Sequence, residues 1–144
     1  MIAEMIERCE IVEECYEFML GYAAQGHPGD AGNPQVREFL RRAVDAVHGL
    51  EESCTDAVER ARHEPTEQSA LAPFLAVLLR DAADSLAVLE LVLAQPVISS
   101  QLIDNLNASI HLRALLTSLF LVSEVLRNQP STETADSHRP RIQA

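Results

Sequence analysis

The sequence contains no lysine and no tryptophan, and its 144 residues include only four phenylalanines and two tyrosines. Without lysine the chain lacks the residue needed for Schiff-base chemistry and for the phosphate-binding loop of nucleotide hydrolases, and no glycine-rich phosphate loop is present. With so few aromatic rings, a core must be built mainly from Leu, Val and Ala, a composition that favours helices. The sequence therefore predicts an aliphatic helical protein and argues against nucleotide hydrolysis.

Basic residues are scarce as well, because 22 acidic residues stand against 11 arginines and give a formal net charge of −11. So negative a surface argues against nucleic acid as a partner. The N-terminus lacks the basic region of a secretory signal, and no stretch of 18 uncharged apolar residues suggests a membrane span. We expect a cytoplasmic protein with no membrane partner.

The cysteines are few and follow no recognised pattern. Cys9, Cys15 and Cys54 are an odd number, and they form neither a CxxC pair nor a zinc-ribbon spacing. Cys9 and Cys54 fall on apolar helical stripes, where a thiol packs as a small hydrophobic group, and Glu14 should raise the pKa of Cys15. We expect reduced thiols with a packing role and no nucleophilic cysteine.

Proline and glycine divide the chain into four predicted helices. Apolar residues recur three or four apart in each segment, the pattern of an amphipathic helix. Asn33 is expected to cap the second helix with Pro34 at its first position, and Pro65 should end it. The third helix begins either at Thr66 or only at Pro73. The predicted helices span residues 2–25, 34–64, 66–95 and 102–128.

Short connections between long helices favour an antiparallel up-down four-helix bundle over residues 1–128. A pair of helical hairpins whose core is completed by a second subunit is the alternative. Residues 129–144 are polar, contain two prolines and offer almost no core-forming side chains, so we expect a disordered C-terminal tail.

A row of glutamates marks the first predicted helix. Like charges three and four residues apart repel, so such a row needs compensation. In an antiparallel pair, Glu17 falls level with Arg41 and Arg42, which would neutralise that end. The row is either a solvated face with such cross-helix pairs or a docking face for a basic protein partner. Its members are Glu7, Glu10, Glu13, Glu14 and Glu17.

Carboxylates surround one histidine on the second predicted helix. Asp45, His48 and Glu52 are spaced for a metal, and Glu10 of the first helix falls level with His48. A carboxylate-bridged di-iron bundle would need a second Glu-x-x-His motif, which is missing, so we predict no cofactor and keep a metal site as a candidate only. His48 could also accept a phosphoryl group, but Glu51 and Glu52 would repel a phosphohistidine.

A second apolar stripe on the first helix predicts self-association. Ile11, Cys15, Phe18 and Tyr22 recur at spacings of four, three and four and flank the core-facing stripe. Left exposed, they would form an apolar patch that a symmetric homodimer would bury. The alternative is that the stripe packs within one subunit, under residues 26–32 or against the fourth helix.

These observations favour a non-catalytic helical protein-interaction module, such as an adaptor, a regulator or an assembly chaperone, that acts as a homo-oligomer. The competing hypothesis is a metal-binding or redox protein that uses carboxylates and histidine of the first two helices.

Overall fold

A computed structural model describes residues 2–61 and 70–128, and every regular element in these two stretches is helical. The predicted all-α class is confirmed. In chain order the elements are α1 (Ile2–Ala24), the 3-10 turn η1 (Asp30–Gly32), α2 (Gln35–His48), α3 (Leu50–Ala61), α4 (Leu71–Leu93), α5 (Ser100–Ala108) and α6 (His111–Arg127). The tail predicted for residues 129–144 and the possible helix start at Thr66 lie outside the described residues.

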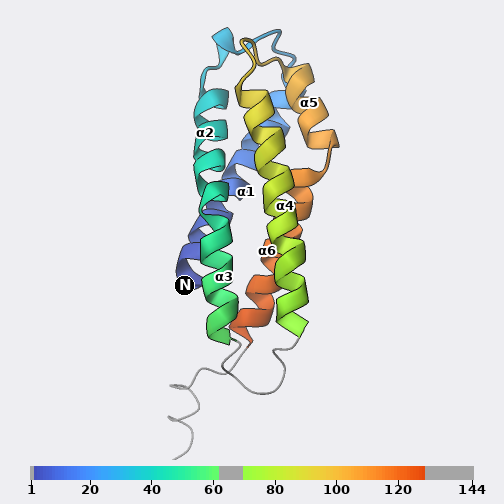
Figure 1. Ribbon diagram of the computed structural model, residues 1–144. Coiled ribbons are helices and arrows are strands. Elements are labelled where there is room, and N and C mark those ends of the chain that lie inside the picture. The colour runs from blue at the N-terminus through green and yellow to red at the C-terminus, as the bar shows by residue number, and fades with distance from the viewer. Residues whose placement is uncertain (1, 62–69, 129–144) are drawn as a thin grey trace, which may run out of the picture.

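The helices lie side by side along one long axis (Figure 1). α2 and α3 follow one another on one side, α4 runs beside them, α5 lies on the other side of α4, and α6 passes behind α4. α1 packs on α2, α3, α5 and α6. The connection after α1 and the connection between α4 and α5 meet at one end, where the amide of Ser100 donates to the carbonyl oxygen of His27 at 2.8 Å.

The second predicted helix is broken at Gly49, between α2 and α3, so the prediction of one continuous helix was wrong. The Arg8 guanidinium occupies the space that a Cβ atom of residue 49 would need. Its Nη1 donates to the carbonyl oxygens of Asp45 and Ala46, each at 3.2 Å. These carbonyls belong to the last turn of α2, which lacks intrahelical partners. The break therefore lets a side chain of α1 cap the end of α2.

The fourth predicted helix is also interrupted. Ile110 separates α5 from α6, and its φ of 60° places it in the left-handed region, which is rare for a β-branched residue. The two helices meet at an angle of 50°. Because periodic apolar residues continue on both sides, the hydrophobic pattern alone did not reveal the bend. At the start of α5, Ser99 Oγ accepts a hydrogen bond from the Leu102 amide at 3.0 Å and acts as its N-cap.

Proline marks helix starts slightly differently from the prediction. Pro34 immediately precedes α2, and neither it nor Asn33 makes a side-chain cap. Pro73 is the third residue of α4, within the first turn, where its missing N–H leaves no hydrogen bond unmade.

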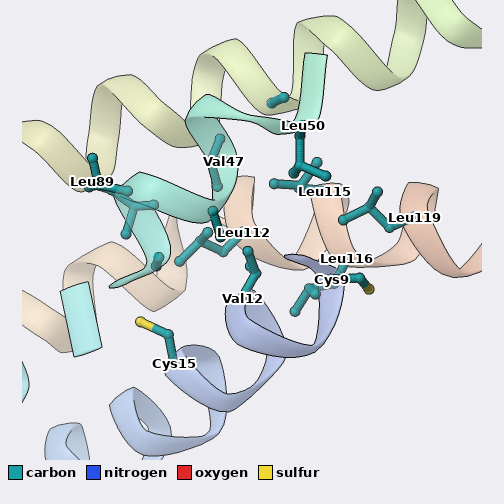
Figure 2. Close-up of a cluster of buried hydrophobic side chains, with 14 of the residues drawn as sticks. Cys9, Val12, Cys15, Val47, Leu50, Leu89, Leu112, Leu115, Leu116 and Leu119 are labelled. Atoms are coloured by element: carbon teal, nitrogen blue, oxygen red, sulfur yellow. The ribbon is translucent and has the colours of Figure 1, made fainter. Parts of the chain in front are cut away.

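The core is aliphatic, as the composition predicts. Buried residues from all six helices form one cluster, dominated by Leu, Val, Ala and the three cysteines. Figure 2 shows its central part, where Cys9 and Val12 of α1 point toward the leucines of α6. Apart from Tyr22, whose ring belongs to this cluster, the buried polar side chains among the described residues are four serines.

Candidate interaction surface

The four predicted metal ligands are spread over three helices. Glu10 is exposed on α1, Asp45 and His48 are exposed on α2, and Glu52 is exposed on α3, beyond the break. His48 Nε2 lies 3.5 Å from a carboxylate oxygen of Glu90 on α4, and both side chains are more than half exposed. Within residues 2–61 and 70–128, no group of three or more His, Cys, Asp and Glu side chains is placed to hold a metal ion.

Arg8, and not the carboxylate of Glu10, is the α1 side chain that lies against the end of α2. It lies against Gly49 and also pairs with Glu4 at 3.2 Å. Ser53 donates a hydrogen bond to the same Glu4 carboxylate oxygen at 2.9 Å. The Ser53 hydroxyl, followed by Arg8, holds the pKa of Glu4 below its usual value. This arrangement ties the start of α1 to the α2–α3 junction and has a structural role.

The side chains of the predicted dimer stripe are engaged inside the chain. Cys15 and Tyr22 are 1% exposed, and Ile11 and Phe18 are partly buried against the core. The Phe18 ring stacks on Phe39 of α2, with 4.3 Å between centroids. Two of the four side chains are thus buried within one chain, and Phe18 packs on α2, whereas the alternative stated from the sequence named residues 26–32 or the fourth helix as the cover.

Tyr22 belongs to a polar network that sequence reasoning missed. Its hydroxyl donates to the carbonyl oxygen of Ile98 at 2.6 Å, and Ser100 Oγ donates to the Tyr22 carbonyl at 2.6 Å. Asp30 accepts from the Ile98 amide at 2.9 Å and from Arg37 Nε at 2.6 Å. The Ile98 amide and then Arg37 lower the pKa of Asp30.

Arg37 completes this end of the molecule. Its Nη atoms donate to the carbonyl oxygens of Leu93, Gln95 and Pro96 at 3.1, 2.8 and 3.0 Å. A guanidinium group has five N–H donors in a fixed fork, so one side chain can bind the end of α4 and the Asp30 carboxylate together. The proline and glycine around Asp30 signalled a loop but gave no hint of this long-range partner.

All three thiols are buried and free. Burial raises the pKa of Cys9 to about 11, with a further contribution from Glu13 and Glu10. Burial raises the pKa of both Cys15 and Cys54 to about 12. Thiols with such pKa values stay protonated near neutral pH, and the thiolate is the nucleophile. The packing role expected for Cys9 and Cys54 is confirmed, whereas the cause for Cys15 is burial and not Glu14.

The glutamate row on α1 faces solvent for most of its length. Glu7, Glu10, Glu14 and Glu17 are exposed, and Glu13 is partly exposed. The expected pairing with the arginines of α2 occurs one turn away from the predicted place. Arg42 Nη2 lies 3.4 Å from Glu14, and no contact joins it to Glu17 in the described part of the chain.

Large apolar side chains remain exposed on α6. Phe120 is 48% exposed, Leu121 is 54% exposed, and Val125 lies one turn beyond Leu121 on the same face. Leu119 and Val122 fill the opposite, buried face. Phe120, Leu121 and Val125 together form the exposed apolar face of α6.

α4 packs beside α6. Ser85 Oγ donates to the carbonyl oxygen of His111 at 3.0 Å, and Ser118 Oγ donates to Asp81 at 2.6 Å. These two bonds join α4 to α6, and Val77 lies one turn before Asp81 on α4. Val77 is itself exposed, so α4 also carries an exposed apolar side chain beyond these contacts with α6.

The exposed apolar face of α6 borders a groove between α1 and α6, the α1–α6 groove, of about 310 Å³. Each helix contributes four residues spaced three, one and three apart, which is one face over two helical turns. The lining residues are Ile6, Cys9, Glu10 and Glu13 of α1 and Phe120, Ser123, Glu124 and Arg127 of α6.

Comparisons with protein-family models, with curated proteins and with solved structures give no match to this chain. Among the described residues, no single helix is long and apolar enough to cross a membrane; α5 and α6 pass that test only as a pair, with the bend between them.

Proposed function

We propose that this protein is a non-catalytic protein-interaction module, and that it binds its partner through the exposed apolar face of α6. The observation that carries this proposal is the exposure of Phe120, Leu121 and Val125 together on one helix. Apolar side chains scattered singly over a surface are ordinary, whereas a contiguous patch with a polar rim is typical of an association site. Glu10, Glu13 and other charged residues provide that rim.

The architecture supports a rigid display of this face. We interpret the fold as an antiparallel up-down four-helix bundle in which α2–α3 and α5–α6 each form one broken column. Along α1 the partners on α2 run in the opposite direction: Phe18 meets Phe39, Glu14 meets Arg42, and Arg8 meets Asp45. A packed bundle holds such a face at low conformational cost on binding.

The chemistry of the side chains gives less support to catalysis or redox function. The three thiols have raised pKa values, and the candidate ligands Glu10, Asp45, His48 and Glu52 are not gathered in the described part of the chain. His48 lies beside the Glu90 carboxylate, an anionic setting that disfavours a phosphohistidine. Three free cysteines fit the reducing cytoplasm, which we propose as its location.

For the expected homodimer we propose a different surface from the one first assigned to it, because Cys15 and Tyr22 are buried within the chain. The exposed apolar face of α6 is the available alternative. A symmetric contact there would bring Glu10, Glu13 and Glu124 of both copies together, which is electrostatically unfavourable. We therefore favour a different protein as the occupant and keep the homodimer as the competing proposal.

Site-specific photo-crosslinking tests the proposal. A photoreactive residue at position 121 should give a discrete adduct with a partner protein in the native cell, whereas the same residue at the exposed position 56 on α3 should not. Replacing Phe120 by Asp should abolish the adduct without loss of helical content. Equal labelling from positions 121 and 56, or none from either, would refute the assignment of this face.

A further inference from the structure

The α1–α6 groove carries a more specific inference, which rests on the function proposed above. We propose that the groove and the adjoining face of α6 bind an amphipathic helix with basic residues along its edges, supplied by another protein. The apolar face of that helix would lie over Phe120 and Ile6, and its basic side chains would meet the glutamates on either side.

The lining of the groove combines three apolar side chains with the buried Ser123 and the charged residues around them. Ile6 and Cys9 line it from α1, and Phe120 lines it from α6, with its ring about half exposed. A half-exposed aromatic ring beside a recess is the kind of anchor that dominates binding energy at protein interfaces. Leu121 and Val125 extend this apolar surface outward on α6.

The rim is acidic, and within residues 2–61 and 70–128 no ion pair involves its carboxylates. Glu10, Glu13 and Glu124 line the groove, and Arg127 at one end is the cation among the lining residues. The ion pairs of the described residues lie elsewhere, as Arg8–Glu4, Arg37–Asp30, Arg42–Glu14 and His48–Glu90. Three carboxylates against one guanidinium, in a chain of net charge −11, complement a basic ligand.

The dimensions fit a helix. The four lining residues of each wall span eight positions, 6–13 and 120–127, which correspond to about 11 Å along a helix axis. Two turns of an added helix can therefore contact both walls at once, in the mode by which an amphipathic helix occupies a groove. Long arginine or lysine side chains can lie along Ile6 and Phe120 while their charged ends reach Glu13 and Glu124.

Electrostatic complementarity favours a basic helix over a second copy of this chain as the occupant. A second copy would present Glu10, Glu13 and Glu124 again, whereas a basic helix neutralises them. Glu52 and Asp56 on α3 provide a matched control. Both are exposed, they are one helical turn apart from each other, and neither lines the groove.

The test uses the full-length chain and fluorescent peptides of about 14 residues, the length of four helical turns. One peptide places Leu on one helical face and Arg on the other, a second replaces every Arg by Glu, and a third scrambles the first. Binding is followed by fluorescence anisotropy. The first peptide should bind at least about tenfold more tightly than the scrambled one, and the acidic peptide should not bind.

Variants decide where the basic peptide binds. Phe120→Ala and the double change Glu10→Lys with Glu13→Lys should each weaken binding by about tenfold or more. The control Glu52→Lys with Asp56→Lys changes the net charge equally and should weaken it much less. Circular dichroism of each variant verifies the fold. Equal losses from the two charge reversals would show non-selective attraction to an acidic protein and overturn the inference.

Two further outcomes distinguish this inference from the function on which it rests. If sedimentation shows a wild-type dimer that Phe120→Ala dissociates, or if the crosslinked partner presents an acidic segment, the face binds protein but the basic-helix inference fails. If the basic peptide binds the Phe120→Ala variant as tightly as the wild type and no crosslink forms from position 121, both the inference and the proposed function fail.

Discussion

The guanidinium of Arg8 fills the space that a Cβ atom at Gly49 would occupy, and from there it caps the last carbonyls of α2. Gly49 has a φ of −87° and a ψ of −6°, so an alanine would meet no backbone strain. The missing side chain, and not an unusual backbone conformation, is what this position requires.

Gly49→Ala should therefore have opposite effects in two backgrounds. With Arg8 present, the new methyl group displaces the guanidinium and loses charged hydrogen bonds worth about 1.5–3 kcal/mol each, against a helix-propensity gain of about 1 kcal/mol. In an Arg8→Ala background only the gain remains, so the same change should stabilise. Urea denaturation of the four proteins gives the coupling energy, and a value near zero would contradict the capping role.

Tyr22→Phe should destabilise the fold by about 1–2 kcal/mol, because it leaves the buried carbonyl of Ile98 without its donor. Tyr16→Phe is the matched control, since Tyr16 is partly buried against the core and its hydroxyl has no partner among the described residues. Equal midpoints of urea unfolding for Tyr22→Phe and the wild type would show that the connection between α4 and α5 does not depend on this bond.

Asp30 should make the stability depend on pH in acid. Its pKa is lower in the folded protein than the usual 3.8, so the unfolded chain binds more protons below about pH 4. Its contribution is present above the unfolded pKa and is lost as the pH falls through the folded pKa. Asp30→Asn should be less stable at neutral pH and should lose less stability on acidification than the wild type or an Asp104→Asn control. Parallel pH profiles would contradict this role.

The native thiols should resist a thiol reagent such as Ellman's reagent at about pH 8, because the pKa values of about 11, 12 and 12 leave almost no thiolate and the side chains are buried. All three should react in denaturant. Rapid reaction of Cys15 in the native protein, identified by mass spectrometry, would show that this residue is accessible.

Phe18→Asp and Leu121→Asp should behave differently. Phe18 stacks on Phe39 inside the chain, so a carboxylate there should strongly lower the unfolding midpoint, whereas Leu121 is 54% exposed and should tolerate the change. Denaturation and light scattering check the two variants. A stable monomeric Phe18→Asp protein derived from a dimeric wild type would restore the interface first predicted for Ile11, Cys15, Phe18 and Tyr22.

The sequence predicted most of what depends on local spacing. The helical class, the aliphatic core and the buried positions of Cys9 and Cys54 follow from apolar periodicity, which a helix converts directly into one buried face. The connections around Gly26 and Pro96 were also expected, because glycine and proline interrupt helices wherever they fall.

Only the tertiary structure revealed the features that depend on contacts between segments distant in the sequence. Gly49 and Ile110 lie in continuous apolar patterns, so those patterns revealed neither the approach of Arg8 to Gly49 nor the bend between α5 and α6. Periodicity could show that Tyr22 lies beside an apolar stripe, but not that residues 96–100 would cover it. Nor could it show that Phe120 and Leu121 would remain uncovered, because the surface left exposed depends on how the helices pack and not on the residues of one helix.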